Sequence, residues 1–338
     1  MAKVLSGFVL AIMLLCGLLP EEGSCGTVLK IGSKYPEASL EGDSIKKVAE
    51  IVLRRSGGRL RIVPYFSESL GNADTQFENV MLGTQDMYME SYSFFQSWIP
   101  EMAVHTLPYM FKDAAEYRDF LLSPLERELE GMLLEKTGMR LVGSAKNWVR
   151  GPYRVLISSR PLLSPEDLKG LKLRMSESRM NFFFWTGMGA SVTVIPWSEV
   201  YLALRQGVVD AASSTMDILY SMKFTEICRH ITMTDENRQQ LAFVINDRKF
   251  RSLGEELQRI LDEAFNEVGD IHSSLVDGAA AESLDRMRRE HGAVFHEPDL
   301  SPWRAKARSV LKVLEEEKAI PPGLVDRVEA WKASRAIQ

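Results

Sequence analysis

The chemistry that this sequence can support starts at Arg174. Apolar and polar residues alternate from Leu171 to Ser176, which predicts a half-buried strand with Arg174 near its exit, on the face opposite the leucines. Ligands of open α/β sheets bind in the crevice beside the strand ends. A guanidinium there can hold a carboxylate through two parallel hydrogen bonds. The spacing equally allows a surface arginine in an ion pair, so the residues alone leave both roles open.

The segment from Ser164 to Thr215 must position this arginine, and it predicts a βαβαβ unit. Ser164 and Pro165 begin a short helical turn that ends at Gly170. Such a unit implies a sheet with helices on its faces. After the Arg174 strand we expect an apolar helix that ends at Gly187, a strand over 191–195, a helix from Pro196 to Gly207 and a buried strand over 208–212.

A similar plan precedes residue 150. The segments FENVMLGTQDMYM and YLALRQGVVDAAS each combine a helix, a glycine, an aspartate and a strand. This internal similarity is short, but it suggests two lobes of similar plan that face each other across a cleft, where small ligands commonly bind. The first half is expected to hold strands over 29–31, 60–65 and 87–90, with helices over 45–53 and 77–81.

The remaining segments are expected to link and cover the two lobes. A strand over 139–145 would enter the interlobe region, and a strand over 242–246 would return to the first lobe. Apolar residues at helical spacing predict further helices over 118–135, 250–287, 310–314 and 325–331.

The first residues are typical of an export signal. Lys3 precedes an apolar run from Phe8 to Leu19, which is too short to span a bilayer comfortably, since that takes about 20 residues. Small residues after Glu22 predict cleavage near residue 26, so residues 1–26 would be a signal peptide. Lipoprotein processing at Cys25 is the alternative.

Composition excludes some classes of function. The chain has 338 residues, of which 45% are hydrophobic and 26% charged, and its net charge is −5. Without a basic excess, nucleic acid is not an expected partner. Of the three cysteines, two fall in or beside the leader, so Cys228 has no evident partner. An exported chain without paired cysteines indicates a periplasm-like compartment and a fold held by its core.

Catalytic and metal-binding patterns are missing from the sequence. It has no HExxH, no GxSxG and no phosphate-binding loop. Cys228 and His230 have no second pair to complete a zinc site. Asp217 and Glu199 could form an acid/base pair, but we expect them on helix surfaces. The sequence therefore predicts no enzyme, no cofactor and no metal.

Several segments together resemble one known family. DLKGLKLRM followed by GASVTVIPWSEVYLALRQGVVD is similar to the solute-binding proteins of tripartite ATP-independent periplasmic (TRAP) transporters, of the dicarboxylate-binding or DctP type. LKIGS, SLGN, HTLPYMFKD and YRVLISSRPL agree in order and spacing, so the resemblance covers nearly all of the chain after residue 27.

The resemblance implies a two-lobed α/β periplasmic binding protein fold, with a ligand cleft between the lobes and a long helix that spans them. Lobe I would comprise residues 27–150 plus about 240–279. Lobe II would comprise residues 151–239 plus about 280–338.

The resemblance also implies a ligand site centred on Arg174, which would pair with the ligand carboxylate. Arg154, which follows the crossover into the second lobe, would make a second contact or brace Arg174 or the lobe. Trp197, the aromatic residue of PWSEVY, would wall the pocket, with core packing as the alternative. Trp148 could take either of the same two roles.

One position departs from the family pattern. Many relatives follow the VVD strand with an asparagine that donates to the ligand, whereas this chain has Ser214 there. A hydroxyl is shorter and donates one proton, so the carboxylate clamp is retained while the ligand stays undefined. On the first lobe, Lys34, Tyr35, Glu90 and Ser91 lie at expected strand exits, where the lysine could complement an acid or be a solvated surface residue.

The function implied is capture of a small organic acid by hinge closure. The closed protein would deliver this ligand to a membrane permease with a small and a large subunit, driven by an ion gradient. We expect a monomer in the periplasm. A sensor subunit that presents its ligand to a receptor and an exported enzyme on the same scaffold are the alternatives.

Overall fold

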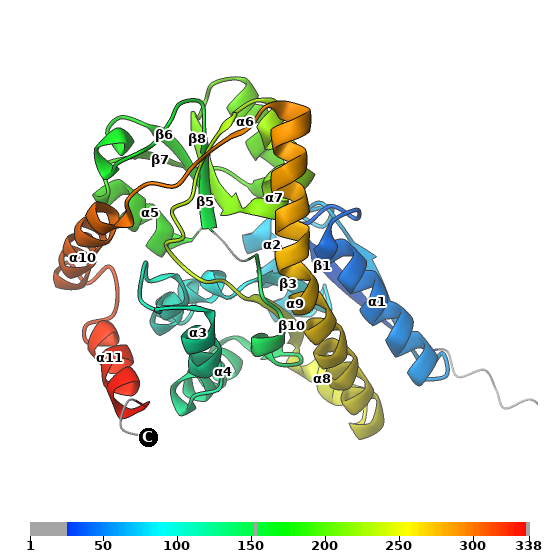
Figure 1. Ribbon diagram of the computed structural model, residues 1–338. Coiled ribbons are helices and arrows are strands. Elements are labelled where there is room, and N and C mark those ends of the chain that lie inside the picture. The colour runs from blue at the N-terminus through cyan, green and yellow to red at the C-terminus, as the bar shows by residue number, and fades with distance from the viewer. Residues whose placement is uncertain (1–25, 152–153, 177, 336–338) are drawn as a thin grey trace, which may run out of the picture.

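A computed structural model describes residues 26–151, 154–176 and 178–335. The predicted leader, apart from Gly26, and the lipoprotein site at Cys25 lie outside the described residues. Two β-sheets form the centres of two lobes, and one long helix runs along both (Figure 1). Within the described ranges, no helix combines the length and the apolar character that crossing a bilayer requires.

The first sheet has the strand order β2-β1-β3-β10-β4. Its strand β10 arrives from late in the sequence and runs antiparallel to both β3 and β4, whereas β1 runs parallel to β2 and β3. The strands are β1 (Thr27–Ser33), β2 (Leu60–Tyr65), β3 (Met87–Ser91), β4 (Met139–Leu141) and β10 (Leu241–Asn246). The helices of this half are α1 (Leu40–Arg55), α2 (Ala73–Leu82), α3 (Ala114–Leu121), α4 (Pro124–Thr137) and α8 (Asp247–Ser252).

The second sheet has the strand order β11-β9-β5-β8-β6-β7. Strand β6 lies parallel to β7 and β8, and β5 lies antiparallel to β8 and β9. The strands are β5 (Arg154–Ser158), β6 (Lys172–Met175), β7 (Ser191–Val194), β8 (Ala211–Thr215), β9 (His230–Thr232) and β11 (Val294–His296). The helices are α5 (Arg179–Gly187), α6 (Val200–Arg205) and α7 (Met216–Ser221).

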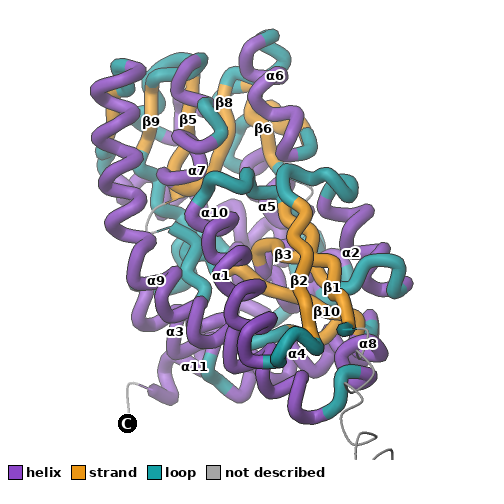
Figure 2. Tube along the Cα trace, turned by 90° about the vertical axis from the view of Figure 1, so that its right-hand side faces the viewer, coloured by secondary structure: helices purple, strands orange, loops and turns teal. Residues whose placement is uncertain are grey.

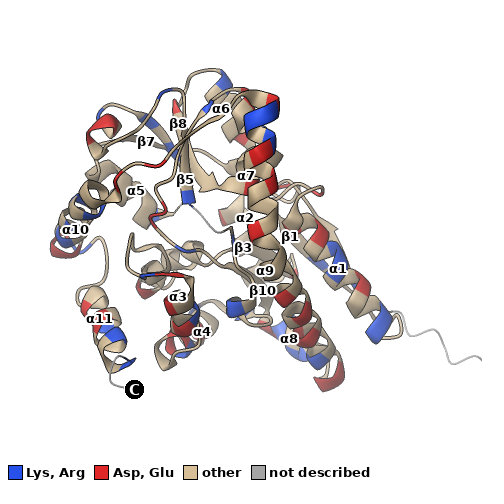
Figure 3. Ribbon diagram, in the orientation of Figure 1, with Lys and Arg blue, Asp and Glu red and all other residues tan. Residues whose placement is uncertain are grey.

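Helix α9 (Glu255–His291) joins the two halves along one side. It packs against α1 beside the first sheet and against α7 beside the second, and Figure 2 shows its length from another side. Its outer face and that of α1 carry intermingled positive and negative side chains, as expected for solvated helix faces (Figure 3). The long spanning helix that the family resemblance implied is therefore confirmed.

The last two helices lie against different halves. Helix α10 (Leu300–Glu316) packs on α5, whereas α11 (Leu324–Arg335) packs on the 3₁₀ helix Pro100–Thr106 of the first half. The boundaries that the sequence suggested for the two lobes stay a prediction.

Several expected elements differ from the structure; the strand expected over 139–145, for example, ends at Leu141. The helix expected over 118–135 is two helices, because Ser123 caps α4 and Pro124 takes its first position. The helix expected over 250–287 is likewise divided at Gly254, whose φ of +76° is outside the helical region. The strand expected over 208–212 begins three residues later at Ala211, because the turn after α6 extends to Asp210.

Two segments cross between the sheets side by side. Arg150 donates its N–H to Gln239 O (2.9 Å), and Leu241 donates to Trp148 O (2.8 Å). Gly151 has a φ of +65°, and a Cβ there would lie 2.6 Å from the Thr215 Cβ. A glycine is needed at this position because the crossover backbone passes so close to the end of β8.

Candidate functional site

Arg174 lies on β6, with only 3% of its surface exposed. Its Nε and Nη2 donate to the carbonyl oxygen of Ile195, at 2.8 and 2.6 Å. The guanidinium carbon lies 5.0 Å from the centre of the Trp197 ring, which is within cation–π range. The structure thus places the guanidinium in the interior and not on the protein surface. Its contact with a ligand stays a prediction.

Trp197 follows the strand next to Arg174 and is buried. Its ring packs against Phe224, with ring centres 5.2 Å apart. The indole Nε1 is also buried and has no hydrogen-bond partner among the described residues. Because buried polar groups are usually hydrogen-bonded, Trp197 combines a packing role with a donor available to a ligand.

Arg154 begins β5 and shares a polar network with a second arginine, Arg150. The Nη1 atoms of both side chains donate to Gln239 Oε1, at 2.8 Å from Arg154 and 2.7 Å from Arg150. Glu236 lies 3.4 Å from Arg154 Nε and forms an ion pair with it. Both arginines are buried, and burial lowers the pKa of Arg154 to about 10. The bracing role considered for Arg154 fits these contacts.

The sequence reasoning missed Arg150. It lies in an irregular crossover that has no hydrophobic period, so nothing predicted its burial. The available signal was its place directly before Gly151, at a point where the chain must change lobes. Gln239 and Glu236 were missed for the same reason, because they lie on the returning crossover.

Lys34 and Glu90 form a buried ion pair at the ends of β1 and β3. Glu90 also accepts hydrogen bonds from the Tyr88 hydroxyl (3.2 Å) and the Ser91 N–H (2.7 Å). The Lys34 ammonium lies 5.1 Å from the centre of the Phe94 ring. Burial lowers the pKa of Lys34 to about 8, opposed by Glu90 and reinforced by Arg150 and Arg174. Lys34 is therefore an interior residue and not the solvated lysine that the sequence also allowed.

Tyr35 and Ser91 lie beside this ion pair. The Tyr35 ring centre is 5.7 Å from the guanidinium carbon of Arg150, and its buried hydroxyl has no partner within the described ranges. Burial raises the pKa of Tyr35 well above its usual value. Ser91 is used locally: its hydroxyl accepts from the Ser93 N–H (3.4 Å) and lies 3.0 Å from the Ser93 hydroxyl.

Strand β8 contributes a row of three consecutive hydroxyls. Ser213, Ser214 and Thr215 are buried, and their hydroxyl oxygens have no hydrogen-bond partners in the described part of the chain. Leaving a buried hydroxyl unpaired costs about 1–3 kcal/mol. Because side chains alternate along a strand, Ser214 faces the opposite side of the sheet from Ser213 and Thr215. Ser214 stands at the position where the family pattern has an amide.

Two carboxyl groups from opposite lobes lie near Arg150. Glu41 is on α1 and Asp217 is on α7, and one oxygen of each is buried without a hydrogen-bond partner among the described residues. Burial, followed by the neighbouring Asp217, raises the pKa of Glu41 to about 8. Burial also raises the pKa of Asp217. Asp217 is half-buried on α7 with its Oδ1 turned away from solvent, so the helix-surface position expected for it holds only in part.

Trp148 lies in the core of the first half. It packs between Phe243 and Phe265, at ring-centre distances of 4.4 and 6.2 Å. Its Nε1 donates to Phe265 O (3.1 Å), so its polar atom is already satisfied. Packing accounts for this residue, and we leave it out of the ligand site.

Comparison with known proteins places this arrangement in a family. Residues 31–318 match DctP, described as bacterial extracellular solute-binding protein, family 7. The chain belongs to this family. Its members are extracytoplasmic binding proteins, and the TRAP members among them bind small acids and work with membrane permeases.

Several relatives of this family 7 protein are known. It is 30% identical over 289 residues to the sialic acid-binding periplasmic protein SiaP of Vibrio cholerae, a match that covers 86% of this chain and 88% of the relative. A TRAP solute-binding protein from Ochrobacterium anthropi with bound L-fuconate has a TM-score of 0.83 at 25% identity, covering 90% of this chain and 99% of that one. One from Fusobacterium nucleatum with bound sn-glycerol-3-phosphate has a TM-score of 0.83 at 26% identity, covering 90% and 96%.

A cavity of about 480 Å³ lies at the boundary between the two halves of the family 7 fold. It is lined by Lys34 and Ser67 from the first half and by Tyr201 and Lys223 from the second. Nearby, the Ser198 N–H donates to Glu68 Oε2 (2.9 Å) across the lobe boundary.

This family 7 protein shows no metal-binding cluster of histidine, cysteine and acidic residues within the described ranges. Cys228 is buried and free, and burial raises the pKa of its thiol to about 11. Such a thiol is a poor nucleophile and a poor metal ligand near neutral pH, since both roles require the thiolate.

Proposed function

We propose that this protein captures a small organic acid between its two lobes and delivers it to a TRAP-type permease. The observation that carries the proposal is the convergence of four buried cations on one interlobe region. Arg150 and Arg174 lie close enough to Lys34 to lower its pKa, and Arg154 shares Gln239 with Arg150. In this scheme, Arg174 takes the carboxylate, with Arg154 as a second contact or brace.

The ligand that best suits the site is a polyhydroxylated acid. Strand β8 offers buried hydroxyls from one lobe, Ser214 on one face and Ser213 and Thr215 on the other, and Tyr35 offers one from the other lobe. Relatives of this chain bind sialic acid, L-fuconate and sn-glycerol-3-phosphate, and each of these carries an acid group beside several hydroxyls or oxygens. Hydroxyls in place of an amide can exchange hydrogen bonds with such groups as donor or acceptor.

Capture would proceed by hinge closure about the two crossovers. The proposed lobes are residues 27–150 plus about 240–279, and 151–239 plus about 280–338. Contacts such as the Gln96 Nε2 donation to Ser178 Oγ (2.7 Å) join the first half to the second and would form as the lobes close. Closure excludes water, and the lower local dielectric strengthens the pairing between the ligand carboxylate and Arg174.

The cellular setting follows from this proposal. The leader would be cleaved near residue 26 and the mature protein would act in the periplasm as a monomer. Its partners would be the small and large membrane subunits of the permease. The protein would release the acid unchanged, without acting as an enzyme.

A thermal-shift screen of the mature protein tests this function. The panel would contain fuconate, galactonate, glucuronate, sialic acid and succinate, with the matching neutral sugars as controls. A ligand at 100 times its dissociation constant stabilises the native state by about 2.7 kcal/mol, so at least one acid should raise the melting temperature by several degrees. Mass spectrometry should recover that acid unchanged. Equal shifts with acids and neutral sugars would refute a carboxylate site, and turnover would refute a binding role.

A further inference from the structure

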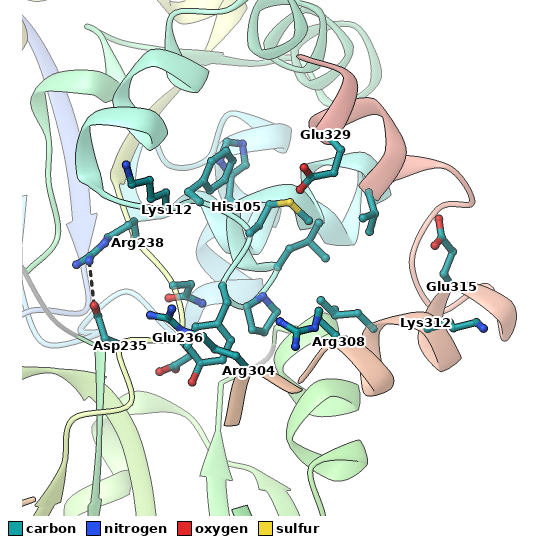
Figure 4. A pocket seen from close by; sticks show the side chains of 18 residues that line it. His105, Lys112, Asp235, Glu236, Arg238, Arg304, Arg308, Lys312, Glu315 and Glu329 are labelled. Carbon is teal, nitrogen blue, oxygen red and sulfur yellow. Dashed lines mark hydrogen bonds and ion pairs between the residues drawn. The ribbon is translucent and has the colours of Figure 1, made fainter. Parts of the chain in front are cut away.

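A second cavity lies where the C-terminal helices meet the rest of the protein (Figure 4). Its volume is about 540 Å³. Its walls come from three parts of the chain: residues 105–112, the returning crossover and the inner faces of α10 and α11. We call residues 234–240, which connect β9 to β10, the strap.

Cationic side chains surround this cavity. Arg304 and Arg308 are one turn apart on the same face of α10, and Lys112 and Arg238 face the cavity from the other walls. Arg304 lies over the Tyr109 ring, with its guanidinium carbon 5.6 Å from the ring centre. Among the described residues, neither Arg304 nor Arg308 has a hydrogen bond or an ion pair.

The carboxylates that line the cavity are, by contrast, all engaged elsewhere. Asp235 pairs with Arg238 (2.9 Å), and Glu236 accepts from the Thr234 hydroxyl (2.6 Å) while pairing with Arg154 across the strap. The other two are Glu315, which accepts from the Gly323 N–H (2.7 Å), and Glu329, which pairs with Lys332 (2.8 Å). None of these carboxylates forms an ion pair with Arg304 or Arg308, although Arg304 acts on Asp235 at longer range and helps to lower its pKa against the effect of burial.

Part of the lining is apolar. It includes Leu107, Met110, Phe111, Leu311 and Val325. Concave sites of roughly 300–1,000 Å³ with apolar walls and a few convergent charges are typical of small-molecule sites.

We propose that this cavity is a second binding site, for a small carboxylate with an apolar body. The carboxylate would lie between Arg304 and Arg308, where a planar guanidinium can pair with both of its oxygens. The apolar body would pack against Phe111 and Leu311. This occupant differs from the polyhydroxylated acid of the interlobe site, and the strap separates the two sites.

Isothermal titration calorimetry of the mature protein tests the proposal, with benzoate and hexanoate as probes. The experiment is done in an Arg174→Ala background, which removes the interlobe clamp. Adding Arg304→Ala and Arg308→Ala together should weaken binding at least tenfold. Lys306→Ala is the matched control, because Lys306 lies on the same helix but lines a different groove with Phe183. That control should leave the affinity unchanged.

Two further results decide the proposal. Asp235→Asn should strengthen binding several-fold, because it removes a negative charge from the cavity wall, and asparagine tolerates the φ of +42° at this position. Inorganic phosphate, which has no apolar body, should bind more weakly than benzoate. No binding of either organic probe at millimolar concentration, equal binding to the Arg304/Arg308 double variant, or tighter binding of phosphate would each overturn the proposal.

Discussion

The two cationic regions of this protein differ in how their charges are held. Between the lobes, Lys34, Arg150, Arg154 and Arg174 are buried and each has a fixed acceptor within the protein. In the second cavity, Arg304 and its neighbour are exposed. Charge that has lost its hydration interacts strongly with its partners, whereas exposed charge is screened by water and salt. The interlobe site should therefore bind through preorganised contacts, and the second cavity through weaker, salt-sensitive ones.

The largest expected effect is on stability, from breaking the buried ion pair of the first lobe. Glu90→Ala leaves Lys34 buried without its partner, and such changes cost about 3–5 kcal/mol. Glu50→Ala, which breaks the exposed pair with Lys47 (3.0 Å), should cost much less, because water screens an exposed ion pair. Urea denaturation measures both, and similar costs for the two variants would remove the contrast between buried and exposed charge.

The next effect is on ligand affinity. Arg174→Ala should weaken binding of the acid found by thermal shift at least tenfold, because removing one partner of a buried charge pair costs about 2–5 kcal/mol. Arg174→Lys should also weaken it markedly, since an ammonium cannot reproduce the bidentate fork. Lys172→Ala, on the exposed face of the same strand, is the control. Calorimetry that gives the same dissociation constant for Arg174→Ala as for the wild type would rule out the clamp.

A smaller effect on stability concerns Glu41 and Asp217, the two carboxyl groups that approach each other from opposite lobes. The pKa of Glu41 is raised from 4.5 to about 8, chiefly by burial. The folded state therefore binds a proton more tightly than the unfolded state, so this contribution to stability is fully present below pH 4.5 and is lost as pH rises through about 8. Its slope is at most about 1.4 kcal/mol per pH unit.

Glu41→Gln should abolish that dependence and make the protein more stable than the wild type above pH 8. Urea unfolding at pH 5, 7 and 9 measures the difference. Glu130 and Asp235, whose pKa values burial raises to about 7 and about 6, titrate in both proteins and so cancel in the comparison. A constant difference between the two proteins over this range would show that Glu41 does not titrate there.

The smallest expected effect is the difference in salt dependence between ligand binding at the interlobe site and at the second cavity. Raising the salt concentration from 0.05 to 0.5 M should weaken benzoate binding at the second cavity several-fold. Binding of the acid at the interlobe site should change less, because buried pairs are screened less than exposed ones. Calorimetry at both salt concentrations checks this, and an equal salt dependence at the two sites would contradict the distinction.

Sequence patterns predicted the elements around Arg174 because each carries a local signal. The alternation over 171–176 reports a strand, and Gly170 and Gly207 mark turns that need a positive φ. The two lobes were predictable from the internal similarity of the two halves and from the family resemblance, and the strand β10 that returns to the first sheet was predictable from its apolar run.

Pairing between distant segments could not be predicted in the same way. Ion pairing of Lys34 with Glu90 depends on the register of β1 and β3, in which Ser33 lies opposite Met89. The three-residue strands β9 and β11 are strands only because they pair with each other and, for β9, with β5. No local sequence pattern indicates that Arg150 is buried, because its burial depends on the path that the chain takes between the two sheets.

Residues 147–149, which lead from the first half into the second, are attached to α9. The Ser273 hydroxyl donates to Asn147 O (2.6 Å) and accepts from the Val149 N–H (3.0 Å), near the middle of the helix. Gly269 leaves room there for Trp148, since a Cβ at that glycine would lie 2.6 Å from the indole nitrogen. The crossover is therefore anchored near the middle of α9, and one half of this helix runs along each lobe. In the proposed hinge motion, one half would turn about this point, so residues near the crossover would travel little while the outer ends of the lobes would travel most.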